Sequence, residues 1–175
     1  MALIYIAGLS GSGKSTIAEL LRNEGYEAHD ADNELCKWFN NVTGEQVSYP
    51  REKANRSSDW QEHHTFKMSE ALVADIASRS KDKTIFILGV APNDLDLAPT
   101  YFDKVFFLRI TEDEMVRRVT TRTTNTYGHD PDQLAVIKKW YQPTVDKYRN
   151  YRANFIDAEQ PVEVVLKKIL QLAAE

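Results

Sequence analysis

Three glycines, a lysine and four hydroxyl residues gather near the start of the chain. The segment GLSGSGKST contributes Gly8, Ser10, Gly11, Ser12, Gly13, Lys14, Ser15 and Thr16. Because glycine has no Cβ and tolerates unusual dihedrals, consecutive N–H groups of such a turn can point inward at phosphate oxygens. Lys14 can then reach the β- and γ-phosphates, and the Ser15 hydroxyl can bind Mg²⁺. The spacing G-x-x-x-x-G-K-S therefore predicts a site for a nucleoside triphosphate and its metal ion.

This motif needs a strand before it and a helix after it, and the flanking residues supply both. Residues 3–7, LIYIA, are apolar and rich in β-formers, which is typical of a strand buried on both faces. In the segment that follows the loop, Ile17, Leu20 and Leu21 share one helical face, and Gly25 is a stop signal. The N-terminus of that helix would add its positive dipole end to the phosphate site. An accidental glycine-rich turn is the alternative, and it is rarer when both flanking elements are required.

The rest of the chain alternates between β-rich and helical patterns. Further strands are predicted at residues 26–30, 84–90, 104–110 and 154–158. Helices are predicted at residues 33–39, at about 59–80, at 111–122, from 131 onward and at 161–172. Two segments have loop composition, namely 41–57 and 91–100. Five strands that alternate with helices predict an α/β fold of the P-loop NTPase kind, a five-stranded parallel sheet with helices on both faces.

Composition narrows the class of protein. The chain has 175 residues, of which 42% are hydrophobic and 27% charged, and this is typical of one globular domain over residues 1–175. The net charge of −4 disfavours nucleic-acid binding, and no apolar run is long enough to span a membrane. One cysteine, Cys36, and a start without signal-peptide features favour the reducing cytoplasm. We expect a monomer or a homodimer.

The residues that follow the strands are candidates for chemistry, because ligands of such a sheet bind beyond the carboxyl ends of its strands. Asp30 ends the strand at 26–30, and Asp32 follows it. They could support a hydrated Mg²⁺ and orient an acceptor hydroxyl, with Asp32 placed as a general base. The alternative for Asp32 is capping of the next helix. The strand at 84–90 ends at Gly89 without a terminal carboxylate, so metal support falls to Asp30, and we expect Gly89 to border the acceptor.

The loop GLSGSGKST and the segment HDADN, residues 29–33, together resemble the small P-loop kinases. This group contains the adenylate-kinase-like nucleoside monophosphate kinases and the shikimate, gluconate and adenylylsulfate kinases. The resemblance covers nearly the whole chain in element order. It implies that Asp30 helps to position Mg²⁺ and that Asp32 contacts the acceptor. The combination of GVAPN with TRTTNTYG also resembles a set of small bacterial proteins described only as ATP-binding or shikimate-kinase-like.

The predicted helix EDEMVRRVTTR carries Arg118 and Arg122, similar to the R-x-x-x-R that opens the lid of these kinases. The resemblance implies that Arg118 packs over the adenine, that Arg122 reaches the transferred phosphate, and that the lid occupies about 122–131. It also implies that IDAEQPVEVV, residues 156–165, wraps the adenine ring. Residues four apart share a helix face, and arginine suits both stacking and phosphate contact. The alternative is two solvated arginines paired with neighbouring carboxylates.

One departure from the resemblance concerns the acceptor. Nucleoside monophosphate kinases typically place an arginine just past the third strand, whereas GVAPNDLDLAPT contains Asp94 and Asp96 but no arginine or lysine. Negative charge there would repel a phosphate, which favours an acceptor that is not phosphorylated near this loop. Arg51 and Arg56, in a polar acceptor-side insert at about 33–60, could grip an acceptor anion instead. A solvated loop is the alternative for these two arginines.

Together these patterns predict a Mg²⁺-dependent kinase that moves the γ-phosphoryl group of ATP to a hydroxyl of a small molecule. Its catalytic residues would be Lys14, Asp32 and Arg122. A nucleoside monophosphate kinase is one alternative, and an ATP-binding module with little or no catalysis is another. The carboxylates at 30 and 32 and the arginine pair favour catalysis, because binding alone needs only the phosphate loop.

Overall fold

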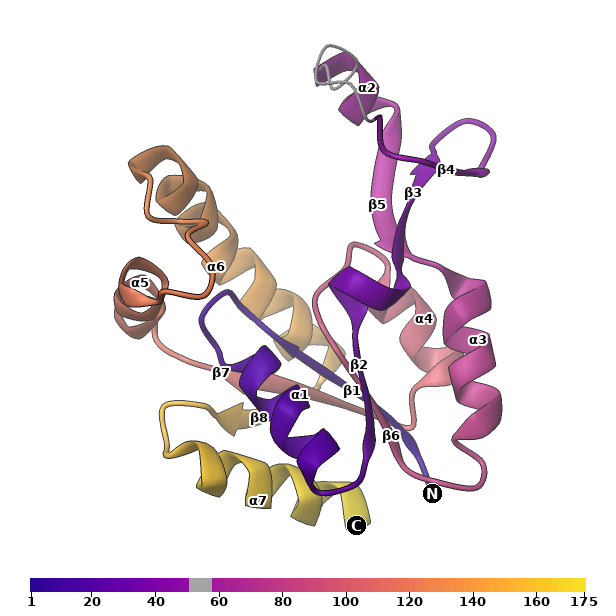
Figure 1. The fold of residues 1–175 in the computed structure, drawn as a ribbon, viewed down its shortest axis with the longest axis vertical. Helices are drawn as coiled ribbons and strands as arrows, with labels where there is room; N and C mark the ends of the chain where they lie inside the picture. Colours follow the sequence, from indigo (N-terminus) through magenta and orange to yellow (C-terminus); the bar gives the residue numbers. More distant parts are fainter. Residues whose placement is uncertain (51–57) are drawn as a thin grey trace.

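A five-stranded sheet lies at the centre of the computed structural model, which describes residues 1–50 and 58–175 (Figure 1). Its strands are β1 (Leu3–Gly8), β2 (Glu27–Asp30), β6 (Ile85–Leu88), β7 (Lys104–Arg109) and β8 (Asn154–Asp157). All neighbouring strands are parallel, in the order β2-β6-β1-β7-β8. The central strand β1 is buried along its whole length, as its apolar sequence predicts. The predicted five-stranded parallel sheet is confirmed.

Helices flank this sheet. The longer ones are α1 (Lys14–Asn23), α3 (Glu70–Arg79), α5 (Glu112–Thr121), α6 (Pro131–Tyr151) and α7 (Val162–Ala174). Helices α1 and α7 pack against each other on one side of the sheet, and α6 passes behind it (Figure 1). Two helices begin with a side-chain cap: Thr111 accepts a hydrogen bond from the N–H of Glu114 at the start of α5, and Asp130 caps α6, whose first residue is Pro131. Within the described residues, no helix is long and apolar enough to cross a membrane.

A second, antiparallel sheet corrects two helix predictions. It contains β3 (Cys36–Asn40), β4 (Gln46–Val47) and β5 (His64–Met68) in the order β4-β3-β5. It projects from one end of the molecule, beside the short helix α2 (Ser58–Glu62) (Figure 1). The helix predicted at 33–39 is wrong, and so is the continuous helix predicted at 59–80. Short apolar patterns do not separate helix from strand, and here cross-strand pairing decides, because Trp38 opposes Phe66 with ring centroids 5.3 Å apart.

The segment 91–100, predicted as a loop, contains helix α4 (Asp94–Tyr101). The prolines and carboxylates of this segment are typical of loops, and they were the reason for that prediction. Asp94 instead lies in the first turn, where a carboxylate favours the positive end of the helix dipole. Leu97 and Ala98 are buried and attach the short helix to the core. Its N-terminus lies just beyond β6, so α4 helps to shape the edge of the sheet at which ligands bind.

Candidate functional site

The glycine-rich loop joins β1 to α1 in a conformation that requires its glycines. Gly11 and Gly13 have φ angles of 78° and 92°, in the left-handed region that side chains with a Cβ rarely adopt. A Cβ at Gly8 would lie 2.4 Å from Ser12 Oγ. The Ser12 N–H donates to the carbonyl of Leu9 at 3.1 Å and closes the turn. The spacing read from the sequence therefore matches the backbone path of the loop.

Lys14 folds back over this loop. Its Nζ donates hydrogen bonds to the carbonyl oxygens of Gly8, at 2.5 Å, and of Leu9, at 3.1 Å. Burial lowers the pKa of Lys14 from 10.5 to about 8, against the opposing effect of the carboxylates of Asp32 and Asp30. Lys14 is thus an ammonium group held in a partly desolvated place, where an incoming anion would stabilise its charge.

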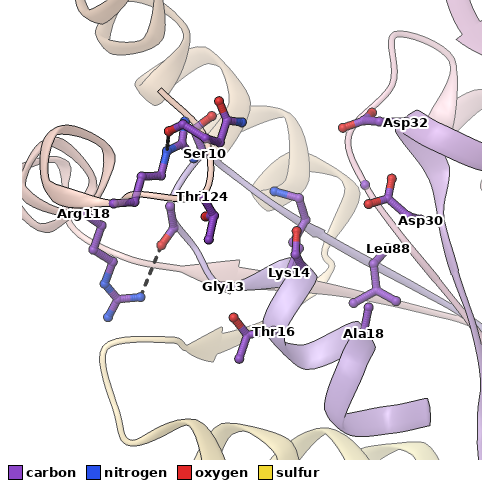
Figure 2. Close-up of a pocket in the computed structure, with 15 residues that line it drawn as sticks. Ser10, Gly13, Lys14, Thr16, Ala18, Asp30, Asp32, Leu88, Arg118 and Thr124 are labelled. Atoms are coloured by element: carbon purple, nitrogen blue, oxygen red, sulfur yellow. Dashed lines mark hydrogen bonds between the residues drawn. The ribbon is translucent and has the colours of Figure 1, made fainter. Parts of the chain in front are cut away.

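A pocket of about 310 Å³ brings most of the predicted residues together. It is lined by the loop and the start of α1, by the ends of β2 and β6, and by the segment around the end of α5. The predicted residues among its lining are Ser10, Gly11, Gly13, Lys14, Ser15, Thr16, Asp30, Asp32, Gly89, Arg118 and Arg122. Lys14 lies between Arg118 on one side and Asp30 and Asp32 on the other (Figure 2). Thr124 and Asn125 also line this pocket, which is called the phosphate pocket below; both lie in the predicted lid at about 122–131, but neither was predicted as a site residue.

Asp30, the last residue of β2, and Asp32, two positions later, have different local roles. The side chain of Asp30 accepts a hydrogen bond from the N–H of Asn33 at 3.1 Å, and it caps the π-helical turn η1 (Ala31–Leu35). The alternative in which Asp32 serves as the cap is therefore wrong. Asp32 makes no hydrogen bond or ion pair with any described residue, and the residue as a whole is exposed while its carboxylate is partly covered. Partial desolvation raises the pKa of Asp32, opposed by Lys14 and assisted by Asp30.

The two arginines are both engaged, in different ways. Arg118 donates from Nε to Glu114 at 2.5 Å, from Nη1 to the Gly11 carbonyl at 3.3 Å, and from Nη2 to the Ala158 carbonyl at 3.0 Å. Arg118 therefore pairs with a neighbouring carboxylate, as in the alternative of two solvated arginines. Its other two hydrogen bonds connect α5 to the loop and to the segment after β8. Arg122 donates to carbonyl oxygens of its own loop, those of Asn125 at 2.8 Å and Tyr127 at 2.7 Å.

A second pocket, of about 260 Å³, opens beside Arg118. Its lining comes from the loop, from α1 and from the segment after β8 that was predicted to wrap the adenine. The lining residues are Ser12, Gly13, Thr16, Ile17, Arg118, Ala158, Gln160, Val162 and Val165. Ser12 is buried, and its hydroxyl has no hydrogen-bond partner among the described residues. This pocket, called the base pocket below, combines apolar walls with an arginine at one edge.

A third pocket, of about 430 Å³, lies on the other side of the loop and is called the acceptor-side pocket below. Its walls come from the loop, from the turn after β6 and from α6. The lining residues are Gly8, Leu9, Ser10, Lys14, Asp32, Val90, Ala91, Pro92, Trp140, Thr144 and Lys147. Ser10, Lys14 and Asp32 line this pocket and the phosphate pocket alike, so the two are contiguous. Sequence reasoning missed the α6 residues, although their spacing of four and three positions marks one helix face.

Asp94 does not present its negative charge to an acceptor, contrary to the expectation from the sequence. Its carboxylate is completely buried, and it accepts hydrogen bonds from the hydroxyls of Tyr5 and Tyr148 and from Lys147 Nζ at 2.5 Å. A carboxylate is stable in such a place only because it is paired and hydrogen-bonded. The negative charge of Asp94 is therefore balanced by partners inside the protein and does not face the pocket. Asp96 is exposed on α4, apart from this network.

Comparison with known proteins places the site in a family. The family described as AAA domain matches residues 4–138. No curated protein matches the sequence of this chain. Shikimate kinase from Acinetobacter baumannii, solved in complex with shikimate, has a similar fold, with a TM-score of 0.60 at 17% identity over 98% of this chain and 92% of that one.

Two further solved structures extend the likeness. A gluconokinase from Sinorhizobium meliloti gives a TM-score of 0.56 at 19% identity, over 98% of this chain and 90% of that one. Deoxyadenosine kinase from M. mycoides with bound dATP gives 0.53 at 16% identity, over 99% and 100% of the two chains. At such identities the likeness establishes the fold, and it confirms the resemblance to small P-loop kinases at that level. The family match covers most of the chain, including the phosphate loop, so this protein belongs to the AAA domain family and has the fold of the P-loop small-molecule kinases.

Proposed function

We propose that this protein is a kinase that transfers the γ-phosphoryl group of ATP to a hydroxyl group of a small molecule. One observation carries the proposal: Ser10, Lys14 and Asp32 line both the phosphate pocket and the acceptor-side pocket. A phosphoryl group that passes from one pocket to the other moves past an ammonium group and a carboxylate. Phosphoryl transfer needs mainly positioning of the reactants and neutralisation of phosphate charge. Lys14 would neutralise the charge, and Asp32 would position the acceptor.

The donor nucleotide would occupy the phosphate pocket and the base pocket together. Backbone N–H groups of the loop from Gly8 to Thr16, apart from that of Ser12, which is bonded to the Leu9 carbonyl, would donate to the phosphates at the positive end of the α1 dipole. Lys14 would exchange its bonds to loop carbonyls for phosphate oxygens. Arg118 stands between the two pockets, where a guanidinium can contact both an aromatic base and a phosphate. The apolar walls formed by Val162 and Val165 suit a base.

The residues at the phosphate pocket fit Mg²⁺. The Ser15 hydroxyl is exposed at the start of α1, and the carboxylates of Asp30 and Asp32 line the same pocket. These are hard oxygen ligands, and Mg²⁺ in such enzymes is bound by one or two carboxylates, substrate phosphates and water. A cage of three or more protein ligands is not needed, and the described residues contain none. Ser15 and Asp30 would hold the ion, which would neutralise phosphate charge when bound.

Asp32 would orient the acceptor hydroxyl and take its proton. Its carboxylate is free of bonds to described residues, and its raised pKa makes it a better base than an ordinary aspartate. Arg122 would meet the charge of the transferred group, which requires it to leave the carbonyls of Asn125 and Tyr127. Closure of the lid, at about residues 122–131, would bring this change and exclude water.

The test uses binding and turnover as separate readouts. Lys14→Ala is expected to abolish stabilisation by ATP in a thermal-shift assay, while Lys168→Ala, an exposed lysine on α7, leaves it unchanged. Asp32→Asn is expected to keep ATP binding and to lose phosphorylation of every acceptor that the wild type uses. Unchanged turnover in that variant would remove Asp32 from the mechanism.

The same assay separates the two alternatives. Stabilisation by ATP without phosphorylation of any acceptor would favour a nucleotide-binding module with little catalysis. Phosphorylation of nucleoside monophosphates, lost in Arg51→Ala or Arg56→Ala, would favour a nucleoside monophosphate kinase. Both arginines lie outside the described residues, so this alternative rests on the sequence alone.

A further inference from the structure

One wall of the acceptor-side pocket is a face of α6. Trp140, Thr144 and Lys147 are four and three positions apart and all line the pocket. Trp140 leaves 58% of its surface exposed, an unusual position for an indole, whose large ring folded proteins mostly cover. A large exposed ring at the rim of a pocket is a candidate contact for a ligand.

Among the described residues that line this pocket, no cation is left for an anionic acceptor. Lys147 Nζ is bonded to the buried carboxylate of Asp94 at 2.5 Å and to the carbonyl of Ala91 at 3.1 Å, so its charge is neutralised within the protein. Lys14 bonds to the loop and is needed for the phosphates. Asp32 contributes a negative charge that faces the pocket. Among the described lining residues, a carboxylate or phosphate of an acceptor would therefore meet repulsion without a compensating partner.

The remaining lining suits an uncharged ring. Val90, Ala91 and Pro92 form an apolar wall after β6, Trp140 offers the face or edge of an indole, and Thr144 adds one hydroxyl. Apolar and aromatic walls with a few polar groups are typical of small-molecule sites, and about 430 Å³ is within their usual range. Planar aromatic rings pack well against indoles.

We infer that the acceptor is an uncharged alcohol that carries a planar aromatic ring, of the chemical class of nucleosides. Its ring packs against Trp140 and the apolar wall after β6, and its hydroxyl lies toward Asp32. This inference rests on the proposed kinase function and names the substrate class of the same site. Trp140 is then a residue that determines specificity, and it takes no part in holding ATP.

The experiment measures acceptor binding by calorimetry in the presence of Mg²⁺ and a non-hydrolysable ATP analogue. The probes are purine and pyrimidine nucleosides, their 5′-monophosphates, shikimate, gluconate and glucose. At least one nucleoside is expected to bind, and more tightly than its monophosphate and than the ligands without an aromatic ring. Trp140→Ala is expected to weaken that binding by about 10-fold or more, whereas Trp140→Phe, which keeps a ring, loses about 3-fold or less. Val136→Ala is the matched control, since Val136 is exposed on α6 but does not line the pocket.

The failures are distinguishable. If the ATP analogue itself does not bind, the proposed kinase function fails first. If the analogue binds but no nucleoside does, or if Trp140→Ala binds nucleosides as well as the wild type, this inference alone is overturned. Tighter binding of shikimate, gluconate or a monophosphate also overturns it. Loss of such binding in the double variant Arg51→Ala, Arg56→Ala would show that the insert supplies the missing cation.

Discussion

Replacement of Lys14 by methionine is expected to stabilise the protein without ATP and to destabilise it relative to the wild type with ATP. Burial lowers the pKa of Lys14 from 10.5 to about 8. Each pKa unit corresponds to about 1.4 kcal/mol, so the folded chain holds this charge at a cost of roughly 3 kcal/mol. Methionine removes the charge, and it also removes two hydrogen bonds to loop carbonyls, worth about 1 kcal/mol each. The expected net gain is therefore about 1 kcal/mol at pH 7.

The assay is thermal unfolding at several pH values, with and without ATP and Mg²⁺. In a chain of this length, about 1 kcal/mol corresponds to roughly 2 to 4 °C in the melting temperature. The folded-state pKa of Lys14 is depressed, so between pH 8 and 10.5 the unfolded chain binds more protons than the folded chain. The free energy of unfolding of the wild type consequently rises with pH in this window relative to that of Lys14→Met. The difference in stability in favour of the variant therefore becomes smaller. Lys168→Met, on the exposed side of α7, serves as the control.

With ATP present the order is expected to reverse. The wild type gains the stabilisation that ligand binding confers by mass action, and the variant does not. ATP affinity of the wild type should also fall as the pH rises above 8, since the ammonium form is the one that attracts phosphate. A variant that is less stable than the wild type without ATP, or a difference that does not change with pH, would refute the view that a desolvated charge is held ready for phosphate.

Three further outcomes are expected from particular contacts. Gly89→Ala should lower the free energy of unfolding by about 1 to 3 kcal/mol in urea denaturation, because its new Cβ would lie 2.5 Å from the buried Cβ of Ala31. Lys147→Ala should lower it by about 2 to 3 kcal/mol, because Asp94 would stay buried with hydrogen bonds but without its cation, while the exposed Lys139→Ala changes it little. Cys36 should resist alkylation at pH 8 in the folded protein and react after unfolding, because burial raises the pKa of its thiol to about 12.

The phosphate loop could be predicted from the sequence because its determinants are local. Gly11 and Gly13 supply the left-handed backbone angles. The spacing of hydrophobic residues on either side of the loop predicts the strand β1 and the helix α1. Thr111 and Asp130 likewise cap helices through bonds to residues two or three positions away. Such features need no knowledge of what lies elsewhere in the chain.

The second sheet could not be predicted in this way because its strands stabilise each other across a long separation. Trp38 opposes Phe66, and Cys36 opposes Met68, so neither strand reveals its state until the other is placed beside it. The acceptor-side pocket has the same difficulty. Its α6 wall is held near the loop by long-range contacts such as that of Lys147 with Asp94, a residue in the segment that was predicted to be a loop.

The buried network around Asp94 explains how the acceptor-side wall is kept in place relative to the loop. The Tyr5 hydroxyl, on the strand that leads into the loop, lies 2.9 Å from the carbonyl oxygen of Gly89 and 3.1 Å from Asp94 Oδ2, and its one hydrogen is shared between these two acceptors. Asp94 in turn accepts from Tyr148 and Lys147 on α6. A satisfied buried network is rigid, because breaking any one of its bonds leaves a polar group without water or partner.

Arg122 is held quite differently. Its bonds go to carbonyls of its own exposed loop, and exchanging them for water or phosphate costs little. In the proposed reaction, the side of the site held by Tyr5, Asp94 and α6 would fix the distance from Lys14 to the acceptor, whereas Arg122 on the other side could rearrange. Phosphoryl transfer needs the first for alignment of the acceptor and the second for exclusion of water at the moment of reaction.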